Sequence, residues 1–160
     1  MADTKMDLAL LYGRIGRIAA NWAYVEMAMV HCIRSAQVLG IELPKGEAPQ
    51  SLSKRKHLLK SAFKTLPELE PFKDEAKALL SRCGERGHKR NEVIHNAAMK
   101  ALGNGKVRLV GFESDNGNYR PKRVELSGKQ MDKIAEDILQ LASDMADFSN
   151  RVALSLVPRD

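Results

Sequence analysis

Apolar side chains recur with a helical period over two long parts of the chain. Within residues 8–39 they alternate steps of three and four positions at Leu8, Leu11, Ile15, Ile18, Trp22, Val25, Met29, Cys32, Ala36 and Leu39. The same steps return near the other end at Met131, Ile134, Ile138, Leu141, Met145, Phe148 and Val152. A phase that is kept over so many turns predicts two long helices, each packed along its length against other helices.

Two further helices are predicted between these long ones. Residues 40–50 contain two prolines and two glycines and predict a loop, after which Ser51 can cap a short basic helix over 52–64. A third helix is expected from about residue 68 towards residue 100. Its apolar face consists of Phe72, Ala76, Leu79, Cys83, Val93 and Ala97.

The period changes to two after residues 103–105. Alternating side chains and an Asn116-Gly117 pair predict a β-hairpin over about 106–126, and Pro121 indicates that its second strand is an edge strand. Ser127 and Gln130 have the spacing of a capping box for the last helix. The fold class predicted is all-α: one domain over residues 1–160, a four-helix up-and-down bundle with a β-hairpin inserted before the last long helix.

The composition fits one soluble globular domain. Of the 160 residues, 44% are hydrophobic and 29% are charged, which is enough apolar material for a proper core. No apolar run has the length of a membrane span and no segment resembles a signal peptide, so we expect a cytoplasmic protein without a membrane partner. Cys32 and Cys83 fall at apolar positions, which indicates buried thiols, although a disulfide stays open. Neither cysteine has a zinc-binding spacing, and no metal or cofactor is expected.

The formal net charge of +6 is compatible with a polyanionic partner. Basic residues gather before and within the third predicted helix, and the candidate RNA-binding residues are Lys54, Arg55, Arg82, Arg86 and Lys89. The alternative is that these are solvated helix faces, which is the common reason for a run of lysines.

Arg90, Asn91 and His95 are the strongest candidates for catalysis. Asn91 and His95 are four positions apart and share a helix face, whereas Arg90 and His95 are about 140° apart around a regular helix. Arg90 must therefore reach around the helix edge. Its planar guanidinium suits a phosphate, and histidine is the side chain that both accepts and donates a proton near neutrality.

The apolar phase of the third helix, continued through its middle, passes through Arg86 and Arg90. Charge on a packing seam is costly unless it is paired or faces a wet cleft. Gly84 and Gly87 lie just upstream, and we expect a local kink or thinning of the helix there to open such a cleft.

The Arg-Asn pair, followed after three residues by His95, resembles the Arg-x4–6-His signature of the HEPN superfamily. The order of the predicted helices is similar to the HEPN scaffold over nearly the whole chain. The resemblance implies a metal-independent endoribonuclease that acts as a homodimer on RNA, with two Arg/His sets lining one groove. It extends to a toxin or defence role with a cognate antitoxin as partner.

By this resemblance His95 transfers protons, Arg90 neutralises charge on the phosphate and Asn91 orients the imidazole or the substrate. Glu26 is the supporting residue, expected to pair with Arg90 or Arg86. Some members carry a modified tyrosine two residues after the histidine, where this chain has Ala97. Two alternatives stay open: a non-catalytic module that binds RNA, a nucleotide or a protein, and a purely structural polar network at a dimer seam.

Overall fold

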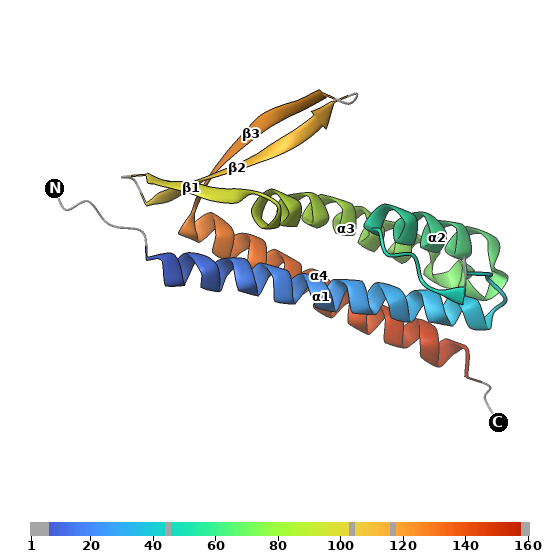
Figure 1. Cartoon of the computed structure of the whole chain (residues 1–160). Coiled ribbons are helices and arrows are strands. Elements are labelled where there is room, and N and C mark those ends of the chain that lie inside the picture. The colour runs from blue at the N-terminus through green and yellow to red at the C-terminus, as the bar shows by residue number, and fades with distance from the viewer. Residues whose placement is uncertain (1–6, 44–45, 103–104, 116–117, 158–160) are drawn as a thin grey trace.

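The computed structural model describes residues 7–43, 46–102, 105–115 and 118–157, with the side chains of residues 97–101 and 115 outside the description. Helices make up most of the chain, and a small antiparallel sheet precedes the last helix (Figure 1). The elements are α1 (Leu8–Val38), α2 (Leu52–Thr65), the 3₁₀ helix η2 (Pro67–Phe72), α3 (Lys73–Ile94), β1 (Ala97–Leu102), β2 (Lys106–Asp115), β3 (Asn118–Ser127) and α4 (Gly128–Ser155). None of the described helices has both the length and the apolar character needed to cross a membrane.

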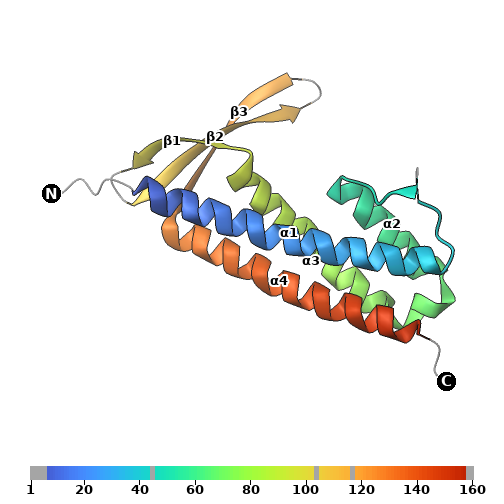
Figure 2. The same ribbon diagram turned by 60° about the horizontal axis from the view of Figure 1, so that its bottom comes forward.

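The two long helices form the centre of the fold. They run side by side in the same direction, as both views show (Figures 1 and 2). Asn21 donates to the carbonyl of Ala135 near one end, and the His31 ring lies 3.3 Å from Ser149 Oγ near the other. The side chains between them are fully buried, among them Ile18, Val25, Met29, Ile138, Leu141 and Met145. The two predicted apolar phases are therefore confirmed as the main core.

The up-and-down arrangement was wrong. Glu26 lies beside Arg55, and further along Cys32 and Leu59 line the same small cavity, so α1 and α2 run in the same direction. The connection over residues 39–51 returns along the bundle before α2 begins (Figure 2). Only α3 runs against the other three. A loop of this length can span the return, which the apolar periodicity alone does not reveal.

The helix caps expected at Ser51 and at Ser127 are confirmed. Ser51 Oγ accepts a hydrogen bond from the backbone of Lys54 at 3.3 Å. Ser127 and Gln130 form a full capping box, with distances of 3.2 and 2.8 Å between the bonded atoms. Each cap satisfies backbone donors that would otherwise have no partner, which fixes where α2 and α4 begin.

The third helix ends earlier than predicted. Instead of continuing towards residue 100, α3 stops at Ile94, and residues 97–102 form strand β1 against β2. The Asn96 side chain donates to the carbonyl of Glu92 at 2.6 Å, which satisfies an acceptor at the helix end. Residues 97–102 are good helix formers, so pairing with β2 overrides their intrinsic preference.

The predicted hairpin is confirmed as the β2–β3 pair, with a regular register from Lys106 opposite Ser127 to Asp115 opposite Asn118. The predicted Asn116-Gly117 turn lies outside the described residues. Because β1 adds to β2, the sheet has three strands in the order β1-β2-β3. Val107 and Leu109 are buried against the helices, whereas Phe112 and Tyr119 are both 75% exposed towards the far end of the hairpin, which extends away from the bundle (Figure 1).

A glycine, rather than an arginine, continues the packing seam of α3. Gly87 is buried, and a Cβ there would lie 2.6 Å from Leu52 Cδ2 and 3.1 Å from the Trp22 ring. Arg86 is displaced to the side of the helix and contacts Asp137 at 3.4 Å. The helix is continuous through this point, so the glycines act by close approach and not by a kink.

Gly87→Ala is expected to lower the free energy of unfolding by about 1–3 kcal/mol, because the added methyl group overpacks against the rigid Trp22 ring. The matched control is Gly16→Ala on α1, where a Cβ would meet nothing within 4 Å. This control should gain up to about 1 kcal/mol from helix propensity. Urea denaturation measures both, and equal gains in the two variants would contradict the close approach.

Candidate functional site

The end of α3 brings the three motif residues together. Arg90 Nη1 lies 2.9 Å from Asn91 Oδ1, to which it donates, and 3.1 Å from His95 Nε2. Asn91 belongs to the last turn of the helix, Arg90 directly precedes that turn, and His95 is the C-cap residue. The expectation that Arg90 reaches around the helix edge is therefore met.

The contact with Arg90 engages one nitrogen of the His95 ring. A guanidinium has donors only, so in a hydrogen bond between the two groups His95 Nε2 is the acceptor. A second proton on the ring would place two donors face to face and break the contact. Asn91 and His95 are exposed and Arg90 is partly buried. The imidazole is thus exposed to solvent, with its accepting nitrogen engaged by Arg90.

Arg90 is hydrogen-bonded at its tip but not at its Nε atom. Its Nε atom is buried and has no hydrogen-bond partner among the described residues. An unsatisfied buried N–H is costly, which makes such an atom unusual in a folded protein. The guanidinium therefore has donor capacity beyond its contacts with Asn91 and His95.

Two polar clefts meet at the motif. One lies between α2 and α3, has a volume of about 450 Å³ and reaches Asn91. The other has a volume of about 180 Å³, lies between the end of α3 and the sheet, and is lined by Asn91, His95, Phe112 and Lys122 among others. His88 and Asn91 line both clefts. Of the motif residues, Asn91 thus lines both clefts and His95 lines the smaller one, whereas Arg90 lies beside them without lining either.

Glu92, inside the motif, is a charged centre that the sequence analysis did not single out. Its side chain is only 14% exposed and lies 3.1 Å from Lys89, 3.4 Å from His88 and 3.6 Å from Lys122. Burial by itself raises the pKa of Glu92. The hydrogen bond from Lys89 and the charges of Lys89, His88 and Lys122 outweigh it and lower the pKa below its ordinary value. Glu92 thus ties strand β3 to the motif helix.

Asn96 makes a second link between the motif and the sheet. While its amide nitrogen caps the Glu92 carbonyl, its side-chain oxygen lies against Gly111 of β2 so closely that a Cβ at residue 111 would overlap it. Glycine is the residue that permits this approach. The position of the small cleft beside His95 follows from these two contacts.

The expected role of Glu26 differs from its observed contacts. Instead of pairing with Arg90 or Arg86, Glu26 accepts a hydrogen bond from Trp22 Nε1 at 3.0 Å and lies 3.6 Å from Arg55 Nη1. The latter distance is an ion pair without a hydrogen bond, consistent with Arg55 Nη1 being buried and unbonded. Glu26 lies four positions after Trp22 on α1. Its contact with Arg55 shows that the Glu26 side chain faces α2 rather than the end of α3.

Most of the five candidate RNA-binding cations are engaged within the protein. Arg82 contacts Asp144 at 2.7 Å and Arg86 contacts Asp137, which joins α3 to α4. Arg55 donates to the Pro49 carbonyl at 2.6 Å, and Lys89 contacts Glu92. Within the described part of the chain Lys54, exposed at the start of α2, has no ion pair. Among the described residues, the cations without an ion pair that lie nearest the motif do not belong to these five.

They are Lys56 and Lys60 of α2, which line the larger cleft together with the rings of His57 and His88. A signal for them is present in the sequence. His88, Asn91 and His95 are spaced three and four apart, which places them along one stripe of α3, and Lys56 and Lys60 share a face of α2. Which stripe of α2 faces which stripe of α3 is a matter of packing.

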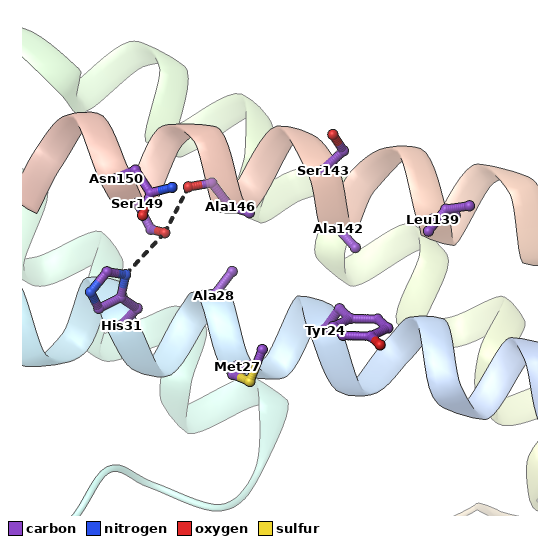
Figure 3. A pocket seen from close by; sticks show the side chains of 10 residues that line it. All are labelled: Tyr24, Met27, Ala28, His31, Leu139, Ala142, Ser143, Ala146, Ser149 and Asn150. Carbon is purple, nitrogen blue, oxygen red and sulfur yellow. Dashed lines mark hydrogen bonds between the residues drawn. The ribbon is translucent and has the colours of Figure 1, made fainter.

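A third cleft lies on another side of the bundle, between α1 and α4. It has a volume of about 460 Å³ and is lined almost entirely by apolar or small side chains, including Tyr24, Met27, Leu139 and Ala142 (Figure 3). None of the candidate catalytic or RNA-binding residues lines it. Its apolar lining does not suit a phosphate.

The two thiols are buried, as the sequence predicted, and both are free. Burial raises the pKa of Cys32 to about 12 and that of Cys83 to about 11, so neither forms a reactive thiolate near neutrality. Among the residues that the structure describes, no group of three or more histidine, cysteine, aspartate and glutamate side chains is placed to hold a metal ion.

Comparison of the chain with protein families, with curated proteins and with solved structures finds no match. The assignment of a function therefore depends on the geometry of the motif and of the two clefts beside it.

Glu92→Gln is expected to lower the free energy of unfolding at neutral pH by about 1–3 kcal/mol, because Lys89 and Lys122 lose a largely buried partner. The folded pKa of Glu92 lies below its ordinary value of 4.5, so the carboxylate stabilises the fold above that pH. The difference between wild type and variant should therefore shrink as the pH falls below about 4.5.

Glu113→Gln is the matched control, since Glu113 lies 3.8 Å from the same Lys122 but is 64% exposed. Its effect should be within about 0.5 kcal/mol. Urea denaturation at a series of pH values measures both variants. A loss that is equal for the two, or that grows towards low pH, would refute the role given to Glu92.

Proposed function

We propose that the protein is a metal-independent endoribonuclease of the HEPN type, with Arg90, Asn91 and His95 as its catalytic residues. The observation that carries the proposal is the single guanidinium nitrogen that contacts both Asn91 Oδ1, which lies between two clefts, and His95 Nε2, which lines the smaller cleft. A cation, a neutral imidazole and an amide are thereby presented together to solvent. These are the groups that cleavage of RNA through its 2′-hydroxyl requires.

The reaction begins when the neutral His95 ring removes the proton of an RNA 2′-hydroxyl. The 2′-oxygen attacks the adjacent phosphorus, and the bond from phosphorus to the 5′-oxygen breaks. A protonated imidazole returns a proton to the leaving 5′-oxygen, so the products are a 2′,3′-cyclic phosphate and a 5′-hydroxyl. Arg90 offsets the charge that builds on the phosphate oxygens, and Asn91 orients the imidazole or the substrate.

Arg90 connects substrate binding to the activation of His95. In the free protein its Nη1 donor occupies the lone pair of His95 Nε2. A phosphate is the stronger acceptor for a guanidinium, because a charge-assisted bidentate pair forms. Arg90 therefore turns from the imidazole to the phosphate when RNA binds, and the freed Nε2 atom becomes available as the base.

The active form is a homodimer in which the ends of two α3 helices meet, so that both Arg/His sets line one RNA groove. The exposure of Asn91 and His95 at the helix end supports this arrangement, since a second copy can reach them. One histidine then serves as base and the other as acid. A cytoplasmic toxin or defence component held by a cognate antitoxin is the setting in which such an activity is expected.

A second candidate is a non-catalytic RNA-binding module. The observation that favours it is the same Arg90–His95 contact, because an imidazole whose lone pair stays occupied cannot take a proton. The two candidates differ in whether RNA is cut, and the following experiment separates them.

The pure protein is incubated with total RNA in the presence of a chelator. Wild type should yield fragments that end in cyclic phosphate, and His95→Ala should lower the rate by about 10²–10⁴-fold because proton transfer is lost. His31→Ala is the matched control: this histidine contacts Ser149 beside the apolar cleft and should leave the rate unchanged. Undamaged RNA in every sample, with RNA binding retained, would favour the non-catalytic module.

The dimer makes a separate prediction. If two copies build one site, the cleavage rate per mole of protein should fall on dilution, in step with the dimer fraction measured by sedimentation. A rate per mole that is constant across the dissociation range would contradict the composite site while leaving cleavage by one copy possible.

A further inference from the structure

The larger cleft between α2 and α3 has a lining that the motif chemistry does not use. Lys56 and Lys60 are one helical turn apart on α2 and line this cleft with His57 and His88. No aspartate or glutamate lines it, and neither lysine has an ion pair within the described ranges. This sets it apart from the basic residues of α3, whose charges α4 and Glu92 largely offset.

The position of one lysine is built into the packing. The Lys56 ammonium lies against Gly84, so closely that a Cβ at residue 84 would displace it. Leu52 lies against Gly87 in the same way and closes the end of the cleft near Trp22. Gly84 therefore makes room for an ammonium group that faces a hollow rather than a carboxylate, and Gly87 makes room for Leu52.

The cleft adjoins the one beside His95. His88 and Asn91 line both, and the smaller cleft is also lined by Phe112, by Lys122 and by the carboxylates of Glu92 and Glu113. Phe112 is 75% exposed. The two lysines thus lie on one side of the motif, and an exposed aromatic ring lies on the other.

We propose that the two clefts form one track for single-stranded RNA, which passes across Arg90 and His95. The proposal rests on the proposed function and names the substrate class. Lys56 and Lys60 hold the phosphates on the α2 side. The rings of His57 and His88, and that of Phe112 beyond the motif, are flat surfaces on which unpaired bases stack.

The shape of the site selects unpaired RNA. A hollow of about 450 Å³ between two helices admits a single strand. A duplex has a convex, regular surface that proteins contact across its grooves, and such a surface does not enter a hollow of this size. Because clefts lie on both sides of Asn91, nucleotides extend in both directions from the phosphate at Arg90. The bond that breaks is therefore internal to the strand, and chain ends are not required.

The test measures binding separately from cleavage. All variants carry His95→Ala, so that a short fluorescein-labelled single-stranded RNA stays intact, and fluorescence anisotropy gives its affinity. Lys56→Ala with Lys60→Ala should weaken binding by about tenfold or more and reduce the slope of log affinity against log salt by about 2. Phe112→Ala should weaken binding with little change in that slope, since stacking carries no net charge.

Lys64→Ala with Lys77→Ala is the matched control, because it removes the same charge from exposed positions of α2 and α3 that do not line either cleft. It should bind RNA almost as the parent does, and thermal melting verifies that each variant folds. Equal losses in the two double variants, or equal affinity of the parent for a matched RNA duplex, would overturn the track.

The failure of the track and the failure of the proposed function give different results. If the wild type cuts RNA and Lys56→Ala with Lys60→Ala cuts it with unchanged KM, the track is wrong and the nuclease stands. If the wild type never cuts RNA but binding depends on these two lysines, the track stands without the chemistry.

Discussion

The end of helix α3 is the constraint on which the site depends. The Asn96 side-chain nitrogen donates a hydrogen bond to the Glu92 carbonyl at the end of the helix, and its side-chain oxygen lies against Gly111 of β2. One amide group thus contacts both the end of α3 and the sheet. His95, five positions after Arg90, stands about 140° from it around the helix axis. The long Arg90 side chain spans this angle, and its Nη1 atom lies 3.1 Å from the ring of His95 at the cap position.

The charges of α3 are divided by the face on which they lie. Arg82 and Arg86 meet carboxylates of α4 and hold the two antiparallel helices in register. Glu92, on another face, gathers cations from its own helix and from β3. Lys56 and Lys60 face a hollow that no carboxylate lines. The surface therefore has a local excess of positive charge beside the motif, which the net charge alone does not place.

The same contact that orders the motif also restrains it. A neutral histidine bonded to an arginine is stable in the absence of a ligand, and an incoming phosphate competes for the guanidinium. This exchange is a local change of hydrogen-bond partner and needs no movement of a domain. The buried and unbonded Nε of Arg90 indicates that the guanidinium is not fully satisfied by the protein itself.

The sequence determined the long helices, their caps, the β2–β3 hairpin and the buried thiols, because each depends on neighbours in the chain or on a regular period. It also selected Arg90, Asn91 and His95, which the fold brings together. It did not determine the direction of α2, the strand formed by residues 97–102 or the partner of Glu26. These are set by contacts between segments that are distant in sequence, and local propensity carries no information about them. For the same reason only the tertiary structure decided that Lys56 and Lys60, rather than Arg82 and Arg86, face the cleft beside the motif. Arg82 and Arg86 form ion pairs with aspartates of α4, and the net charge of the sequence does not show which cations are paired in this way.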